Sequence, residues 1–358
     1  MEDLSMSEKI VINSRLRNYS LEFVEDVFLL VNNEKKESSF YIIDSIIFEL
    51  YRKQCDALIE HNGYLVVDAS EQHKSYLYCA TVIEELLKKG VKRNSTLVAI
   101  GGGIIQDITA FIASVLFRGV DWLFIPTTLL AQTDSCIGGK TSINFGDVKN
   151  TIGNFNPPRE IYIDLSFLDT LPVDDIKSGI GEILHYLYYA NSTFIDPLFD
   201  EYNDLLKNRQ SLKKFISESL RIKKSIIEID EFDKGERNKF NYGHTFGHAL
   251  ESVTNYKIKH GQAVTVGMDI ANFISCQMGL IDEALYLNIK SKLKLNYPNY
   301  LLNSVDIKSY IKYLAKDKKN IDDQLVCILT SGPGILKKIK IPMDNNFIDQ
   351  ITKYFHTS

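Results

Sequence analysis

Residues 95–107, STLVAIGGGIIQD, run from an apolar, β-rich segment through three glycines into a helical pattern. Glycines in such a turn let the backbone approach a ligand, and the helix that follows offers free N–H groups to a pyrophosphate. The spacing is not the GxGxxG fingerprint of the common dinucleotide-binding turn. A plain tight turn is the alternative, but three consecutive glycines favour a ligand-binding turn. The stretch therefore predicts a strand–turn–helix unit that binds phosphate.

The sequence around this stretch alternates in the same way. Short runs rich in Ile, Val, Tyr and Phe end at turn residues, which is typical of strands. Helical patterns lie between them, and a βαβ order predicts a mostly parallel sheet with helices on both faces. The predicted fold of this half is a Rossmann-like dinucleotide-binding α/β domain. Its strands are SFYIIDS (39–45), GYLVVDA (63–69), STLVAIGGG (95–103), DWLFIPTT (121–128) and EIYIDL (160–165), with helices at 79–90 and 104–117.

The alternation of strand and helix patterns ends at DTLPVDD (169–175), and the segments that follow have helical periodicity. We place the domain boundary between Pro172 and Asp175. Residues 1–172 are predicted to form the NAD-binding α/β domain, and residues 173–358 an all-helical domain that binds metal and substrate. The predicted helices of this second domain are 176–189, 211–230, 243–253 and 261–279.

Composition excludes several classes of protein. With 358 residues, two domains are the default expectation. A net charge of −5 gives no basic field for nucleic acid or an acidic membrane. The five cysteines have no CxxC spacing, so a disulfide framework or a cysteine-rich zinc site is not expected. No signal-peptide core and no apolar run of spanning length is present, so the protein is expected to be cytoplasmic.

The segment NYGHTFGHALE places His244 and His248 four residues apart, on one face of a predicted helix. The pair could be core histidines or part of a metal site. Glu182 and His185 lie on an earlier helix, and His260 begins a later one. A catalytic zinc takes three protein ligands and keeps one position open. This concentration of ligand-type residues favours the metal site.

Charged residues mark further candidates for a binding site. Lys223 lies in the middle of an apolar helix face, where a cation is costly unless it is paired. Snorkelling to the surface is the alternative. Lys140 follows two glycines and Lys149 comes nine residues later, a setting that suits phosphate binding. Asp44 ends a predicted strand, where a carboxylate can bind ribose hydroxyls.

Taken together, the motifs resemble 3-dehydroquinate synthase and, more broadly, the sugar-phosphate cyclases. They are GGGIIQDITAFIASVLFRGVDWLFIPTTLLAQTDSCIGGKTSIN, KNTIGNF, SGIGEIL, NYGHTFGHALE and HGQAV. The matches run in order from about residue 40 to residue 330. The resemblance implies tightly held NAD, one divalent metal (Zn²⁺ or Co²⁺), an active site between the two domains, and a homodimer.

The resemblance also implies roles for individual residues. The metal ligands would be Glu182, His244 and His260. The NAD contacts would be Asp44, Glu71, Lys74, Gly101, Gly102, Gly103, Asp107, Thr127, Thr128, Asp134, Lys140 and Lys149. The substrate contacts would be Lys140, Asn150, Lys223, Arg237, Asn241 and His248. Arg118 would reach the partner subunit's site, and Lys318 or Lys319 would close over the phosphate.

Three positions and one loop depart from the family pattern, and two further positions match one member of it. Gln262 replaces the usual Glu after His260–Gly261. His185 stands where dehydroquinate synthases usually have Lys, and it could keep the donor role of that Lys or become a fourth metal ligand. Gln106 replaces the usual Gly of the glycine-rich turn. The loop NFGDVKN lacks the usual proline and is more similar to cyclases that accept sedoheptulose 7-phosphate. Arg237 and Asn241 match the dehydroquinate pattern, and an arginine suits a substrate carboxylate.

The sequence therefore predicts an NAD- and zinc-dependent cyclase. The expected reaction converts 3-deoxy-arabino-heptulosonate 7-phosphate to 3-dehydroquinate and phosphate. A cyclase for another sugar phosphate is the first alternative. A metal-dependent polyol dehydrogenase is the second, and a non-catalytic relative that keeps the fold is the third. The cluster of cationic and amide residues argues against the dehydrogenase, and the intact metal-ligand set argues against the non-catalytic relative.

Overall fold

The computed structural model describes residues 9–33, 39–60, 62–146, 148–316 and 324–357. The chain forms two compact units. Unit 1 comprises Met1–Leu171 and Lys223–Phe232, and unit 2 comprises Pro172–Ile222 and Asp233–Ser358. The last residues of the long helix α9 (Arg209–Ile229) therefore belong to unit 1. The functional division between residues 172 and 173 stays a prediction, because compactness does not show what each unit does.

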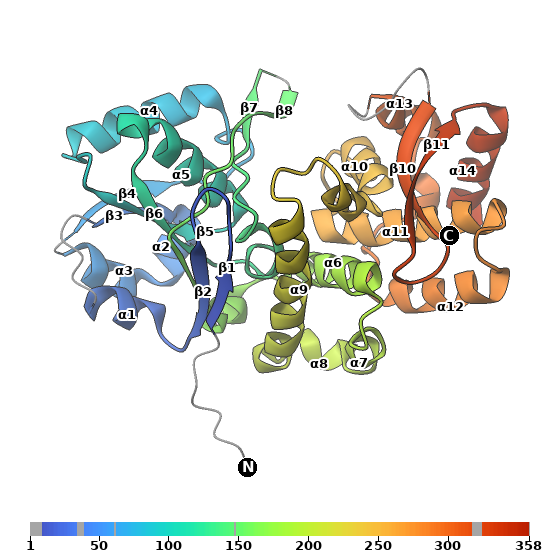
Figure 1. Ribbon diagram of the computed structural model, residues 1–358, viewed down its shortest axis with the longest axis horizontal. Helices are drawn as coiled ribbons and strands as arrows, with labels where there is room; N and C mark the ends of the chain where they lie inside the picture. Colours follow the sequence, from blue (N-terminus) through green and yellow to red (C-terminus); the bar gives the residue numbers. More distant parts are fainter. Residues whose placement is uncertain (1–8, 34–38, 61, 147, 317–323, 358) are drawn as a thin grey trace, which may run out of the picture. The chain divides into compact units, whose positions relative to one another are not determined.

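Unit 1 is built on a seven-stranded sheet in the order β1-β2-β9-β6-β5-β3-β4 (Figure 1). Neighbouring strands are parallel except β1 and β2, which pair antiparallel. The mostly parallel sheet and its five predicted strands are confirmed. The strands β1 and β2 and the ribbon of β7 and β8 were not predicted. The bounds are β1 (Lys9–Ile12), β2 (Tyr19–Val24), β3 (Ser39–Asp44), β4 (Gly63–Val67), β5 (Thr96–Gly101), β6 (Asp121–Pro126), β7 (Ile143–Phe145), β8 (Val148–Ile152) and β9 (Glu160–Asp164).

Helices cover both faces of this sheet, which explains why the central strands β3, β5 and β6 are buried along almost their whole length. Tyr41 and Ile43 point to the face covered by α1, α2 and α3, where they join one buried cluster with Phe28 and Leu58. Helices α4 and α5 lie on the opposite side (Figure 1). The bounds are α1 (Val27–Asn33), α2 (Ser45–Leu50), α3 (Arg52–Ile59), α4 (Tyr76–Lys88) and α5 (Gly103–Val115), with short helical turns η1 (Leu116–Arg118), η2 (Ala131–Ser135) and η3 (Leu165–Thr170).

Unit 2 is helical, as predicted, apart from one antiparallel hairpin of β10 (Gln324–Thr330) and β11 (Leu336–Pro342). The expectation of an all-helical domain is corrected by this hairpin. Its strand β10 is a short apolar run, a pattern that periodicity alone does not distinguish from a buried helix. The helices are α6 (Val173–Ala190), α7 (Ile195–Asp200), α8 (Tyr202–Leu205), α10 (His244–Val253), α11 (His260–Gln277), α12 (Glu283–Leu293), α13 (Ile307–Ala315) and α14 (Asn345–Thr357), with turns η4 (Glu236–Asn241), η5 (Lys294–Asn296) and η6 (Leu302–Ser304).

Glycines let three helices of unit 2 touch backbone to backbone. A Cβ at Gly181 of α6 would lie 2.0 Å from the carbonyl oxygen of Gly261 on α11. A Cβ at Gly267 of α11 would lie 2.0 Å from the carbonyl oxygen of Gly243, which precedes α10. Neither distance is possible for a real side chain, so α11 is held close to both neighbours only because these residues are glycines. No helix among the described residues is long and apolar enough to cross a membrane.

Candidate functional site

The glycine turn lies at the carboxyl-terminal edge of the parallel sheet. Strands β5 and β6 end beside each other, with Gly101 aligned to Pro126. Gly102 precedes α5, and a Cβ on it would lie 3.0 Å from Cγ2 of Thr128. The turn therefore packs against the segment that begins at Thr127, whose N–H donates to the carbonyl of Gly101 (3.0 Å). This edge, with free N–H groups at the start of α5, is where open α/β sheets bind ligands.

Asp44 ends β3 at the same edge of the sheet. Its Oδ1 accepts a hydrogen bond from the N–H of Ile46 (2.9 Å) and so caps α2. Burial raises the pKa of Asp44, against the lowering effect of this hydrogen bond. The side chain therefore has a structural role as well as the ribose-binding role predicted for it.

Lys74 and Asp107 form a largely buried ion pair. Lys74 Nζ lies 2.6 Å from Asp107 Oδ2. Burial raises the pKa of Asp107 to about 6, although the Lys74 ammonium acts in the opposite direction. The structure thus joins two residues that the sequence placed in the NAD site from motifs 33 positions apart.

Asp107 should make stability depend on pH. In the unfolded chain its carboxyl titrates near the ordinary value of 3.8. Its stabilising contribution is therefore present below about pH 4 and is lost as the pH rises through about 6. We expect the free energy of unfolding of wild type, minus that of Asp107→Asn, to fall by up to ~3 kcal/mol across this window. Urea unfolding between pH 4 and 7 measures it, and parallel pH profiles for the two proteins would contradict the assignment.

Asn144 links three predicted site residues, and the sequence interpretation missed it. Its Nδ2 donates to Oε1 of Glu71 (2.8 Å), and its N–H donates to the carbonyl of Lys74 (2.8 Å). Its Oδ1 accepts from the N–H of Asn150 (2.9 Å), which has a positive φ of 52°. Lys149 Nζ lies 3.4 Å from the same oxygen of Glu71. The only hint in the sequence was a polar residue inside an apolar strand.

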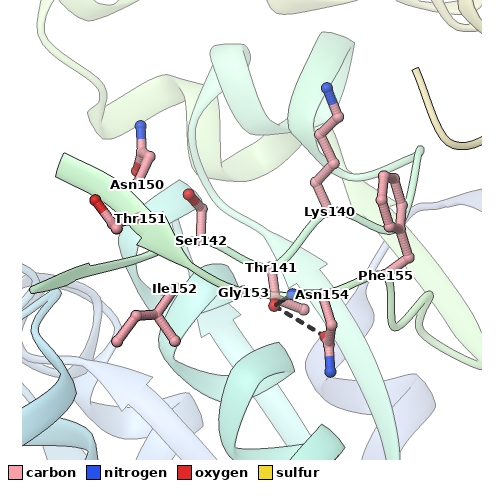
Figure 2. A pocket seen from close by; sticks show the side chains of 9 residues that line it. All are labelled: Lys140, Thr141, Ser142, Asn150, Thr151, Ile152, Gly153, Asn154 and Phe155. Atoms are coloured by element: carbon pink, nitrogen blue, oxygen red, sulfur yellow. Dashed lines mark hydrogen bonds between the residues drawn. The ribbon is translucent and has the colours of Figure 1, made fainter. Parts of the chain in front are cut away.

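Strand β8 and the segments that precede β7 and follow β8 line a cavity of about 290 Å³ (Figure 2). Lys140, which precedes β7, and Asn150, in β8, extend their side chains in the same direction (Figure 2). A cation and an amide on one cavity can bind a phosphate or a hydroxyl-rich ligand. The lining residues are Lys140, Thr141, Ser142, Asn150, Thr151, Ile152, Gly153, Asn154 and Phe155.

Lys223 points inward and is paired, as its place on an apolar helix face predicted. It is 6% exposed. Its Nζ donates to the carbonyl of Asp134 (2.6 Å) and to Oδ1 of the same residue (2.9 Å). The snorkelling alternative is therefore wrong. A predicted substrate contact and a predicted NAD contact lie side by side within unit 1.

Glu182, His244 and His260 converge in unit 2, and their ligand atoms lie within 4.8 Å of one another. Oε1 of Glu182 is 3.6 Å from Nε2 of His244 and 3.2 Å from Nε2 of His260. Among the described residues, none donates a hydrogen bond of normal geometry to this buried oxygen. An orphaned carboxylate oxygen facing two imidazoles fits a divalent cation.

Glu251, on the last turn of α10, is a second residue that the sequence interpretation missed. Its Oε2 lies 3.1 Å from Nδ1 of His260. Burial by itself lowers the pKa of His260, but Glu251 and Glu182 outweigh it and hold the pKa well above its ordinary value. The negative charges that stabilise a proton on His260 would also stabilise a metal cation bound at the same place. Glu251, His260 and the exposed His248 form an alternative ligand group that shares His260.

His185 and the predicted substrate contacts Arg237 and Asn241 lie outside the ligand group of Glu182, His244 and His260. His185 is fully buried, with Nδ1 4.0 Å from Oε2 of Glu182, and it belongs to neither ligand group. Arg237 is 4% exposed in the turn η4, where Asn241 donates from Nδ2 to the carbonyl of Asn238 (2.7 Å).

Arg118 is exposed on a turn with a positive φ of 68°. The predicted lid residues Lys318 and Lys319 lie outside the described residues.

Comparison with known proteins shows the family of the chain. The family model for the 3-dehydroquinate synthase N-terminal region matches residues 64–178, and the model for the C-terminal region matches residues 179–320. A 3-dehydroquinate synthase of Dictyoglomus thermophilum is 35% identical over 332 residues, which are 91% of this chain and 93% of that protein.

Two solved structures of cyclases have the same fold. One is 2-deoxy-scyllo-inosose synthase with carbaglucose-6-phosphate, NAD⁺ and Co²⁺, with a TM-score of 0.88 and 24% identity over 98% of this chain and 100% of that one. The other is 2-epi-5-epi-valiolone synthase of Streptomyces hygroscopicus with NAD⁺ and Zn²⁺, with a TM-score of 0.83 and 23% identity over 95% and 97%. At these identities the likeness establishes the fold. The identity to the Dictyoglomus protein along nearly the whole of both chains establishes more: this chain belongs to the 3-dehydroquinate synthase family of phosphate-eliminating cyclases.

Proposed function

We propose that this protein converts 3-deoxy-arabino-heptulosonate 7-phosphate to 3-dehydroquinate and phosphate, as a homodimer in the cytoplasm. The observation that carries the proposal is the convergence of Glu182, His244 and His260 in a chain of this family. One carboxylate and two imidazoles make the ligand set of a catalytic zinc that keeps a position open for substrate.

The metal site would use these three residues as ligands. A bound Zn²⁺ or Co²⁺ polarises a substrate oxygen and lowers the pKa of its hydroxyl. Glu251 would hold the His260 ring in place through Nδ1, which leaves Nε2 to face Glu182. His248 is exposed one helical turn after His244, a position from which it would contact the substrate phosphate.

The NAD site would use the edge of the sheet in unit 1. Bound NAD would supply hydride chemistry: it would take a hydride from the carbon that bears a ring hydroxyl, whose proton is released, and later return the hydride, so the reaction has no net redox change. The glycine turn and the start of α5 would bind the pyrophosphate, and Asp44 would bind ribose hydroxyls. The Lys74–Asp107 ion pair and the hydrogen bonds of Asn144 would hold the other predicted NAD contacts, Glu71 among them, in fixed positions.

The substrate would be bound by the remaining polar side chains. Lys140 and Asn150, on one cavity wall, suit a phosphate or hydroxyl groups, and Lys223 supplies a further cation. Arg237 would bind the carboxylate in a bidentate manner. The exposed Arg118 lies on a strained turn, which supports its predicted reach to a partner subunit.

Phosphate release by purified protein loaded with zinc and NAD tests the proposal. We expect release from the heptulosonate phosphate, with 3-dehydroquinate formed and no net NADH. Release from sedoheptulose 7-phosphate alone would make the protein a different cyclase, as His185 and the loop NFGDVKN would then indicate. Net NADH from a polyol, with no phosphate released, would make it a dehydrogenase.

A further inference from the structure

Gln106 lies in the first turn of α5. Its side chain is 4% exposed and makes two short hydrogen bonds to one residue. Nε2 donates to the carbonyl oxygen of Ser135 (2.6 Å), and Oγ of Ser135 donates to Oε1 of Gln106 (2.6 Å). A buried amide with both ends satisfied by one partner holds that partner in a defined position.

Ser135 ends the π-helical turn η2, and the residue before it is Asp134. The carbonyl and carboxylate of Asp134 both accept hydrogen bonds from Lys223. Two successive carbonyls, at positions 134 and 135, are therefore held by side chains from different helices. A glycine at position 106 could not supply the second of these contacts.

The beginning of the same segment is held to the glycine turn as well. Thr128 packs against Gly102, where a Cβ would lie 3.0 Å from its methyl group. Residues 127–135 are thus tied to the start of α5 at both ends, by Thr128 and by Ser135. This segment carries Thr127, Thr128 and Asp134, three of the residues predicted to contact NAD.

We propose that Gln106 is a positioning residue for NAD. It fixes residues 127–135 against the glycine turn, so that Asp134 and the two threonines meet the cofactor already in place. A preorganised site binds more tightly because less ordering is left to occur on binding. This inference rests on the proposed use of NAD.

Gln106→Met tests the inference, because Met keeps the length and volume of the side chain and removes both hydrogen bonds. Isothermal titration calorimetry with NAD should give a Kd roughly 10-fold higher than that of wild type. Ser135→Ala removes only one of the two bonds and should raise the Kd by roughly 3-fold. Thr109→Val is the matched control one turn along α5, since Thr109 is fully buried and its Oγ1 makes no hydrogen bond with any residue that the structure describes.

Thermal unfolding of each variant separates positioning from simple stabilisation. An unchanged Kd in Gln106→Met, with a lowered Tm, would mean that Gln106 only stabilises the fold, and the inference would be wrong. An equal rise of the Kd in Thr109→Val would also overturn it, because any change in the core of α5 would then suffice. If Gln106→Met does not fold, Ser135→Ala decides by the same criterion. Failure of wild type to bind NAD at all would overturn the proposed function and this inference with it.

Discussion

Replacing Glu182 by Gln is expected to reduce bound metal from about one ion per chain to a small fraction and to lower turnover by at least roughly 10³-fold. The substitution keeps the volume of the side chain but removes the negative charge that faces both imidazoles. A neutral amide is a poor ligand, and its NH₂ group would point a donor at the cation. Metal content by mass spectrometry and phosphate release by a coupled assay measure the two effects.

Matched variants show whether the loss is specific. His356→Ala removes an exposed histidine of α14 and should change neither quantity. Glu251→Gln should have an effect between those of Glu182→Gln and His356→Ala. Its metal affinity should be weakened by roughly 10–100-fold, because this residue only orients His260. Full metal content and turnover in Glu182→Gln, together with their loss in Glu251→Gln and in His248→Ala, would assign the metal to the alternative group of His248, Glu251 and His260.

Replacing Arg237 by Ala is expected to lower kcat/KM for the heptulosonate phosphate by roughly 10²–10³-fold. The physical reason is the loss of a buried, bidentate partner for the substrate carboxylate, which would be left desolvated and unpaired. Arg237→Lys should recover only part of the loss, since an ammonium cannot make the planar paired contact. Steady-state phosphate release over a range of substrate concentrations measures these effects.

Comparing two substrates tests whether the loss of activity in Arg237→Ala depends on the substrate carboxylate. Sedoheptulose 7-phosphate has no carboxylate, so whatever slow turnover it supports should be little changed in Arg237→Ala. Arg93→Ala, at an exposed position of unit 1, serves as a control for loss of positive charge. Equal losses with both substrates would mean that Arg237 has a general structural role, and the preference for a carboxylate would need another explanation.

The strands of unit 1 were predictable because burial on both faces requires a continuous apolar run, and such runs end visibly at Asp44, Gly101 and Pro126. The helices α6, α9, α10 and α11 were predictable from their period. The strands β1 and β2 and the hairpin of β10 and β11 were not, because short strands that pair antiparallel carry few residues of pattern and depend on what they pack against.

The sequence by itself determined the fold class, the kinds of residue available for chemistry, and the inward position of Lys223, because periodicity and residue type are local properties of the chain. Only the tertiary structure decided which of these residues meet. His244 and His248 share one helix face, yet only His244 lies near Glu182. That choice depends on how closely the helices approach, which Gly181, Gly243, Gly261 and Gly267 allow by removing every Cβ from the contacts. The contacts of Asn144, of Glu251 and between Gln106 and Ser135 could not be predicted from the sequence for the same reason, since each joins residues that lie near each other only after the chain has folded.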